Sequence, residues 1–220
     1  MTQEITNNLT NLIKEELSQN LSDKLKNVNV IELRDFKKET GIYINADFIA
    51  GYLFYKGKDY VLLEENTFPY LSESRQKSIL FHEFMHLIST KKNDKDSDVG
   101  FVFRKINFVN INEGLNEIAA GYFFEKAYKD LKYYYVKAYN LYRKICEYLI
   151  SYIYKDIKEF FIDYINESPY SFYKKIFYTF KINNLLELKK IMDYIVYEVK
   201  RCNKSPNDLI KEKFQLRVQE

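Results

Sequence analysis

Residues Ile79–Ile88 read ILFHEFMHLI, an apolar run interrupted by His82, Glu83 and His86. The chain of 220 residues contains two histidines, and both lie in this run, four positions apart, with a glutamate directly after the first. Two histidines placed at random would give this arrangement with a frequency on the order of one in a thousand. The pattern therefore indicates a chemical role for these three residues.

Side chains four residues apart on a helix project from one face, so His82 and His86 can direct their ring nitrogens at one metal ion. Glu83 lies about 100° further round the helix, where it can reach a water beside the metal. The spacing predicts two metal ligands and a base on one helix. The alternative is a pair of core histidines beside a surface glutamate.

A catalytic zinc site needs a third protein ligand and an open position for water. The chain has no third histidine, and its two cysteines are isolated, so the third ligand must be a carboxylate. The candidates are Asp94, Asp96 and Asp98 in a charged loop, Glu113 and Glu117 on the next predicted helix, and acids further along the chain. A helix positions a ligand better than a loop does, because less ordering is required on binding.

Glu113 and Glu117 are also four positions apart and share a helix face. One of them can bind the metal while the other accepts the remaining ring N–H of a ligand histidine. That second contact would fix the histidine tautomer and raise its basicity. The spacing of the two glutamates could therefore supply a ligand and its supporting group together.

The segments HEFMH and INEGLNE together resemble the gluzincin metallopeptidases, in which a His-Glu-x-x-His helix is joined by a glutamate from a later helix. The resemblance covers about residues 40–125. It implies that His82, His86 and Glu113 bind one zinc ion per chain. It also implies that Glu83 is the catalytic base and that Glu117 supports a ligand histidine.

The string Ile111-Asn112-Glu113 followed by Glu117 is similar to the thermolysin-type pattern, and Asn112-Glu113-Gly114 is similar to the aminopeptidase N-type pattern. The gap between His86 and Glu113 is longer than in the thermolysin type. No counterpart of the exopeptidase elements that clamp a substrate's amino terminus is present. The resemblance therefore implies a zinc-dependent endopeptidase acting on peptide or protein substrates.

Two further features follow from the resemblance. The strand predicted at YVLLEE (residues 60–65) would hold an extended substrate along its free edge by strand addition. The oxyanion would need a donor besides zinc, and no histidine remains to supply it. Tyr122 is about half a turn out of phase with Glu113. The donor must be a tyrosine, an arginine or the backbone, and the candidate tyrosines are Tyr133, Tyr134, Tyr135 and Tyr139.

The N-terminal part of the chain mixes helix and strand patterns. Residues 3–26 have an amphipathic helical spacing, VNVIEL and IYINADF are strand-like, and GYLFYKGKDYVLLEE reads as a hairpin around Lys56–Asp59. Ser72 is the expected N-cap of the His-Glu helix, which should end near Thr90. An exposed charged loop follows, and FVFRKINFV (residues 101–109) could be a strand or an irregular wall.

A second helix is expected to begin near Asn110 or Asn112. The rest of the chain has helical spacing, with breaks near Pro169, Asn183–Asn184 and Pro206. The predicted fold class is α+β, with a small mixed sheet of three or four strands packed on the His-Glu helix and the glutamate helix. We predict a zincin-like catalytic region at residues 1–127 and a helical subdomain at 128–220.

Composition narrows the protein class. Almost half of the residues, 46%, are apolar, which is enough for a core without disulfides. No leader-like start and no membrane-length apolar run is present, and the two cysteines are far apart, so we expect a soluble, cytoplasmic protein without a membrane partner. The lysines are spread along helices, as is typical of solvated faces, and nucleic-acid binding is not expected. The oligomeric state is not indicated.

Two other functional hypotheses fit the same residues. In the first, the chain is a non-catalytic helical interaction module in which a metal only staples two helices together. In the second, it is a metallopeptidase-like regulator or toxin whose sole substrate is one partner protein. A closed site with four protein ligands would favour the first hypothesis over an enzyme.

Overall fold

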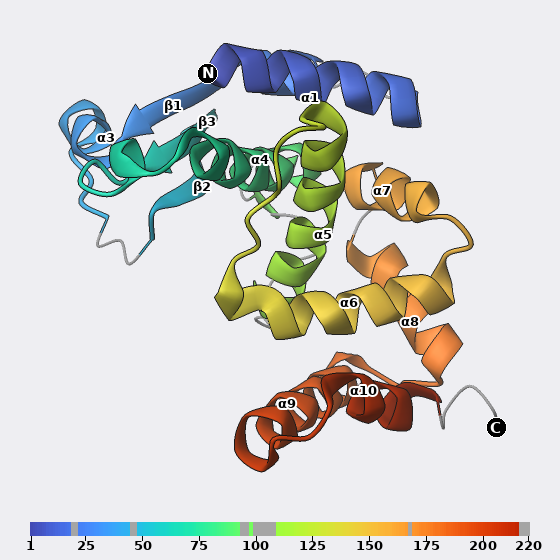
Figure 1. Ribbon diagram of the computed structural model, residues 1–220. Helices are drawn as coiled ribbons and strands as arrows, with labels where there is room; N and C mark the ends of the chain where they lie inside the picture. The colour runs from blue at the N-terminus through green and yellow to red at the C-terminus, as the bar shows by residue number, and fades with distance from the viewer. Residues whose placement is uncertain (19–21, 45–47, 93–96, 99–108, 167–168, 216–220) are drawn as a thin grey trace. The chain divides into compact units, whose positions relative to one another are not determined.

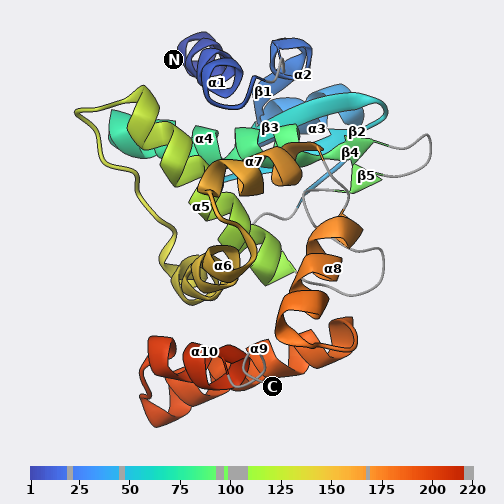
Figure 2. The ribbon, with the colours of Figure 1, turned by 90° about the vertical axis from the view of Figure 1, so that its right-hand side faces the viewer.

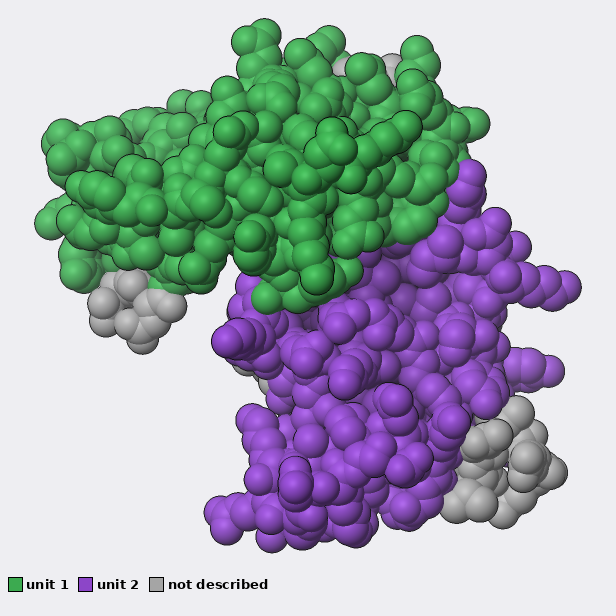
Figure 3. Space-filling model, in the orientation of Figure 1, with its two compact units in different colours: residues 1–90, 119–135 green, residues 91–118, 136–220 purple. Residues whose placement is uncertain are grey.

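The computed structural model describes residues 1–18, 22–44, 48–92, 97–98, 109–166 and 169–215. The chain divides into two compact units (Figure 3). Unit 1 comprises residues 1–90 and 119–135, and unit 2 comprises residues 91–118 and 136–220. The division into a catalytic region at 1–127 and a helical subdomain at 128–220 stays a prediction.

Unit 1 begins with two helices where one helix was predicted. α1 spans Thr2–Leu17 and α2 spans Ser22–Lys26. α1 ends at Ser18, which adopts a left-handed conformation with φ 54° and ψ 28°. The apolar stripe of α1 is buried, as its spacing predicts; its buried residues are Ile5, Leu9, Ile13 and Leu17.

The sheet of unit 1 has three strands, β1 (Val28–Glu32), β2 (Ala50–Tyr55) and β3 (Lys58–Leu63), shown in Figure 1. The strand order is β1-β3-β2, with β1 parallel and β2 antiparallel to β3. The predicted hairpin is confirmed. Lys56 and Gly57 form its two-residue turn, and both have positive φ, at 47° and 79°, as a type I′ turn requires.

The expectation that YVLLEE provides a free sheet edge is wrong. These residues lie in and just after β3, the central strand, which pairs with β1 on one side and β2 on the other. A strand paired on both sides has no backbone groups left to hold a substrate. Because hydrophobic patterning does not specify strand order, the sequence could not distinguish β3 from its hairpin partner.

α3 (Leu33–Thr40) was not predicted. It directly follows β1, and Phe36, its one buried residue, packs edge-on against Tyr60 of β3 with ring centroids 5.0 Å apart. In the segment IYINADF, residues 42–44 and 48 are not in a strand, and 45–47 lie outside the described residues.

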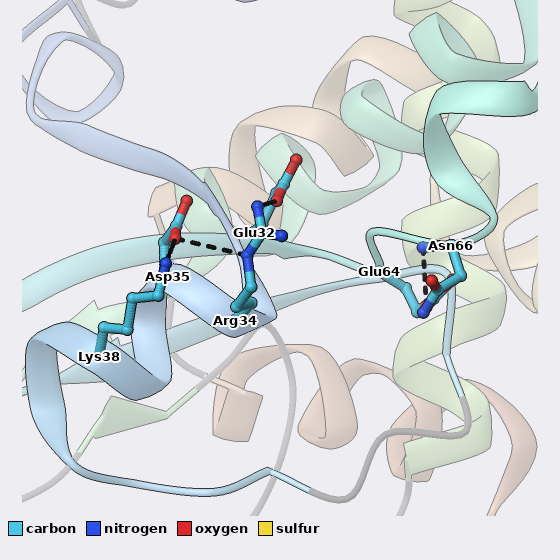
Figure 4. Close-up of polar contacts among 6 residues, drawn as sticks. All are labelled: Glu32, Arg34, Asp35, Lys38, Glu64 and Asn66. Atoms are coloured by element: carbon cyan, nitrogen blue, oxygen red, sulfur yellow. Dashed lines mark hydrogen bonds and ion pairs between the residues drawn. The ribbon is translucent and has the colours of Figure 1, made fainter.

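Short-range polar contacts lie at the C-terminal ends of β1 and β3. After β1, Arg34 pairs with Glu32 at 2.8 Å, as Figure 4 shows. After β3, the Glu64 carboxylate accepts hydrogen bonds from both the backbone and the side-chain amide of Asn66.

α4 (Glu73–Ser89) carries the His-Glu motif and follows the short 3-10 helix η1 (Phe68–Tyr70). The predicted boundaries are confirmed, with Ser72 at the N-cap and Thr90 at the C-cap. α4 packs on β2 and β3, and every residue from Leu80 to Ser89 is buried. The motif therefore lies within the core of unit 1.

α5 (Val109–Ala127) is one uninterrupted helix whose first part is grouped with unit 2 and whose second part is grouped with unit 1. It begins close to the predicted start. Within unit 2, a Cβ atom on Gly114 would lie 2.8 Å from the carbonyl carbon of Tyr142. Glycine is therefore required where the backbone at Tyr142 approaches α5.

Unit 2 also contains the two-residue strands β4 (Lys91–Lys92) and β5 (Ser97–Asp98), and FVFRKINFV lies almost entirely outside the described residues. Its remaining elements are η2 (Lys137–Tyr139), α6 (Asn140–Ile153), α7 (Ile157–Asn166), α8 (Pro169–Phe180), α9 (Leu185–Cys202) and α10 (Pro206–Gln215). α9 and α10 lie side by side, as Figure 2 also shows. The predicted breaks are confirmed, since prolines begin α8 and α10 and Asn184 caps α9.

The structure confirms the predicted α+β class, with a small mixed sheet and a mostly helical C-terminal half. Within the described parts of the chain, none of the helices combines the length and the apolar character that crossing a membrane requires.

Candidate metal centre

The two histidines of α4 direct their rings at each other. His82 and His86 are both 6% exposed, and their Nε2 atoms are 3.1 Å apart. Two nitrogens bound to one tetrahedral zinc ion at 2.0–2.1 Å would be about 3.3 Å apart. The histidine pair therefore already has nearly the spacing of two ligands of one ion.

Glu83 is buried, at 7% exposed, and its Oε2 atom accepts a hydrogen bond from the backbone N–H of Tyr52 at 2.8 Å. A buried carboxylate needs such a donor, because burial without one is costly. The alternative reading, in which the glutamate following His82 lies on the surface, is wrong in that respect.

The Tyr52 amide points away from the β2–β3 ladder. The N–H of Glu64 donates to the carbonyl of Ile49, so hydrogen-bonded pairs recur at every second residue of β2, starting from Ile49. Ala50 and Tyr52 fall between these pairs and direct their backbone groups to the other side of the strand. The outer edge of β2 thus supplies the donor that fixes Glu83.

The side chain of Tyr52 anchors this edge. Its hydroxyl donates to Oδ1 of the buried Asp59, across the hairpin, at 2.8 Å. Burial, and in addition the bond to Asp59, raise the pKa of Tyr52. The hydroxyl therefore remains a donor throughout the physiological pH range.

The C-terminal turn of α4 is held by hydrogen bonds to its carbonyl groups. Thr90 Oγ1 donates to the carbonyl of His86 at 2.7 Å, and the Thr90 N–H donates to that of Leu87 at 3.3 Å. Lys24 Nζ donates to the carbonyl of Ile88 at 2.8 Å. These contacts hold the turn that contains the second histidine.

Within unit 1, α5 contacts α4 through Phe124, whose ring packs edge-on against Phe81 with centroids 5.3 Å apart. Glu117 and Glu113 precede Phe124 by seven and eleven residues, which is close to two and three helical turns. Both glutamates therefore lie on the same face of α5 as Phe124.

One ligand atom from each of His82, His86 and Glu113 lies within 4.8 Å of the other two. Closing such a set to tetrahedral spacing requires a movement of no more than about 1.5 Å, within the reach of a side-chain rotamer. Two imidazoles and a carboxylate are also a donor set that suits zinc. These residues fit the metal predicted for them.

Glu117 is fully buried, and its Oε2 accepts a hydrogen bond from the N–H of Val136 at 3.1 Å. This contact accounts for one of its oxygens. Its predicted role beside a ligand histidine stays a prediction.

The other candidate ligands are placed less favourably or are not described. Asp94 and Asp96 lie outside the described residues, as does the side chain of Asp98. Cys146 is fully buried, and burial raises the pKa of its thiol, which opposes the thiolate form that binds metals. Cys202 is exposed, and neither cysteine forms a disulfide.

The four candidate oxyanion donors have different surroundings. Tyr133 is buried against Phe124, and Tyr134 is about half exposed. The Tyr135 ring covers Gly121 of α5 so closely that a Cβ there would lie 2.7 Å from the Tyr135 hydroxyl. Tyr139 ends η2. Their predicted role as oxyanion donors stays a prediction.

Tyr122 was excluded from that role by helical phase. Its hydroxyl donates to Oε2 of Glu16 on α1 at 3.4 Å. This contact directs the side chain toward α1, in agreement with the exclusion.

Comparison of the chain with protein-family models, with curated proteins and with solved structures found no match. The resemblance to gluzincins therefore rests on the residues of the motif alone. Sequence reasoning missed Tyr52 and Lys24. A backbone N–H has no residue signature, and Lys24 lies 64 positions before the carbonyl that it contacts.

Proposed function

We propose that the chain is a zinc-dependent endopeptidase with one zinc ion held by His82, His86 and Glu113. The observation that carries the proposal is the convergence of the three ligand atoms beside a buried, hydrogen-bonded Glu83. A zinc ion held there would supply the Lewis acidity that polarises a peptide carbonyl and acidifies a water molecule.

Glu83 would act as the general base. The Tyr52 N–H holds its Oε2, so the carboxylate has a fixed orientation, and Oε1 is the oxygen that would take a proton from the attacking water. The same carboxyl group would then deliver the proton to the leaving amine. A base fixed by a backbone amide needs no reorganisation before the reaction.

The outer edge of β2 is the surface where an extended peptide would bind. Among the described residues β2 pairs with β3 alone, and Ala50 and Tyr52 direct backbone groups outward. Because Glu83 contacts this edge at Tyr52, a peptide added there would pass next to the base. The proposed peptide-binding strand is therefore β2, and not β3, the strand that was expected from the sequence.

We further propose that the protein acts in the cytoplasm on peptide or protein substrates, without a membrane or nucleic-acid partner. The two free cysteines and the spread of charge along the helices support this. A preference for one partner protein would appear as cleavage of that protein and not of generic peptides.

Elemental analysis of the purified protein should find about one zinc per chain, and a diverse peptide mixture analysed by mass spectrometry should show internal cuts. A Glu83→Gln variant should keep its zinc and lose at least about 100-fold in hydrolysis, because the base is removed while the ligands remain. Glu73→Gln, at the exposed start of the same helix, is the matched control.

Loss of zinc together with activity in Glu83→Gln would instead identify Glu83 as a ligand. A hydroxamate should bind the zinc-loaded protein, since an open coordination position is required for catalysis. Zinc that binds no hydroxamate would point to a closed, non-catalytic metal site.

A further inference from the structure

The helix α4, which carries the candidate ligand His86, ends without a residue in the left-handed conformation. His86 lies three residues before Ser89, the last residue of the helix. The last four carbonyl groups of any helix lack partners within the helix, and many helices satisfy them with a glycine in the left-handed conformation. Here the C-cap is Thr90 in an extended conformation, with φ −69° and ψ 130°.

In α4, side chains donate hydrogen bonds to these last carbonyl groups. The hydroxyls of Ser89 and Thr90 both donate to the carbonyl of His86, at 3.2 and 2.7 Å. Two residues further on, the carbonyl of Ile88 accepts a hydrogen bond from Lys24 Nζ at 2.8 Å. The same ammonium group lies 3.4 Å from the carbonyl of Thr90, so it bridges the last turn and the residue that ends it.

Lys24 has the charge that this position favours. The carbonyl end of a helix carries partial negative charge, and a cation there is stabilising, the more so when it is partly buried. Lys24 is half-buried on α2, which packs against α4. Its bond to Ile88 therefore connects a separate helix to the turn that holds His86.

We propose that Lys24 is a positioning residue for the metal ligand His86. The inference rests on the proposed function, because it assumes that His86 binds zinc. Helix ends fray, and in an unrestrained last turn the backbone of His86 would sample conformations that move Nε2 away from that of His82. By fixing the turn before the metal arrives, Lys24 reduces the ordering that binding requires.

Lys24→Met keeps the length and the apolar stem of the side chain and removes the donor. Full-length protein should bind zinc about tenfold more weakly, at the lower end of the effect of groups that support metal ligands. The affinity is measured by competition with a chromophoric chelator. In the zinc-free protein, amide hydrogen exchange at residues 86–90 should be faster than in the wild type. Lys24→Arg, which retains a donor and the charge, should recover most of both properties.

Two controls separate positioning from stability. Lys26→Met changes an exposed lysine of the same helix and should match the wild type in both measurements. Leu9→Ala removes buried apolar volume from α1 and should lower the melting temperature without changing the zinc affinity measured well below it. Lys24→Met with a lower melting temperature but unchanged zinc affinity would overturn the inference.

The failure of this inference is distinguishable from the failure of the proposed function. If the wild type bound no zinc, the proposed function would fail. Hydrogen exchange would still show whether Lys24 orders the last turn of α4, because it needs no metal. Unchanged protection of residues 86–90 in Lys24→Met would overturn the inference even if zinc bound normally.

Discussion

The two histidines and the glutamate of the candidate site make different contacts. His82 and His86 face each other through Nε2, whereas Glu83 is bonded to the Tyr52 amide. The i, i+4 spacing dictates the first arrangement, and the one-residue offset of Glu83 dictates the second. The spacing in the sequence therefore predicted that the two histidines face each other, because a helix converts spacing directly into direction.

Glu113→Gln should weaken zinc binding by more than the roughly 100-fold typical of changes around a ligand, because a neutral amide replaces an ionised ligand. Glu125→Gln, on an exposed position of the same helix, is the matched control and should bind zinc like the wild type. Isothermal titration measures both. Equal affinities for the two variants would exclude Glu113 as the third ligand.

Glu117→Gln tests the residue one turn further along α5. A glutamine carbonyl can still accept the Val136 N–H, so the structural contact is retained. If Glu117 also orients a ligand histidine, the variant should lose about 10–100-fold in zinc affinity with little change in melting temperature. Wild-type affinity in Glu117→Gln would limit the role of Glu117 to the contact with Val136.

At the scale of elements, segments with a regular apolar stripe were predicted and a segment without one was missed. α3 has one buried residue, Phe36, among charged neighbours, so no periodicity marks it as a helix. Its stability comes from packing Phe36 against the sheet, which is a tertiary contact. Strand order is also a tertiary property, so the sequence alone does not show that β3 is the central strand.

The role of β2 can be tested at its backbone. Tyr52→Pro removes the N–H that holds Glu83, and proline is tolerated on an edge strand where the N–H points away from the ladder. Tyr52→Ala removes the same side chain but keeps the N–H. We expect both variants to retain zinc and the proline variant to have a kcat at least about tenfold below that of the alanine variant.

Peptide hydrolysis and zinc content measured on the two Tyr52 variants decide this prediction. Equal kcat values would show that the amide does not orient the base. A loss of zinc in the proline variant alone would indicate that β2 supports the ligands and not only Glu83.

At the scale of the whole molecule, α5 is divided between the two compact units, so the candidate ligand Glu113 and the contact residue Phe124 lie on one continuous helix. The sequence predicted this helix and its two glutamates. It could not predict that the helix would be divided between units, because unit boundaries depend on contacts between distant segments.

Zinc should stabilise the folded chain, since a site assembled from two helices exists only after folding. At a free zinc concentration of 100 times Kd, the gain is about 2.7 kcal/mol, which for a chain of this size corresponds to a rise in Tm of roughly 5–10 °C. Calorimetry with and without a chelator measures the shift. A Tm that does not respond to zinc would argue against binding by the folded protein.

The central claim is that His82, His86 and Glu113 bind one zinc ion and leave a coordination position open. Anomalous X-ray diffraction at the zinc edge from crystals of the zinc-loaded protein tests it most directly. We predict one peak per chain, about 2.0–2.2 Å from Nε2 of both histidines and from a Glu113 oxygen, with no fourth protein ligand. A peak away from the histidine pair, or one with four protein ligands, would contradict the account.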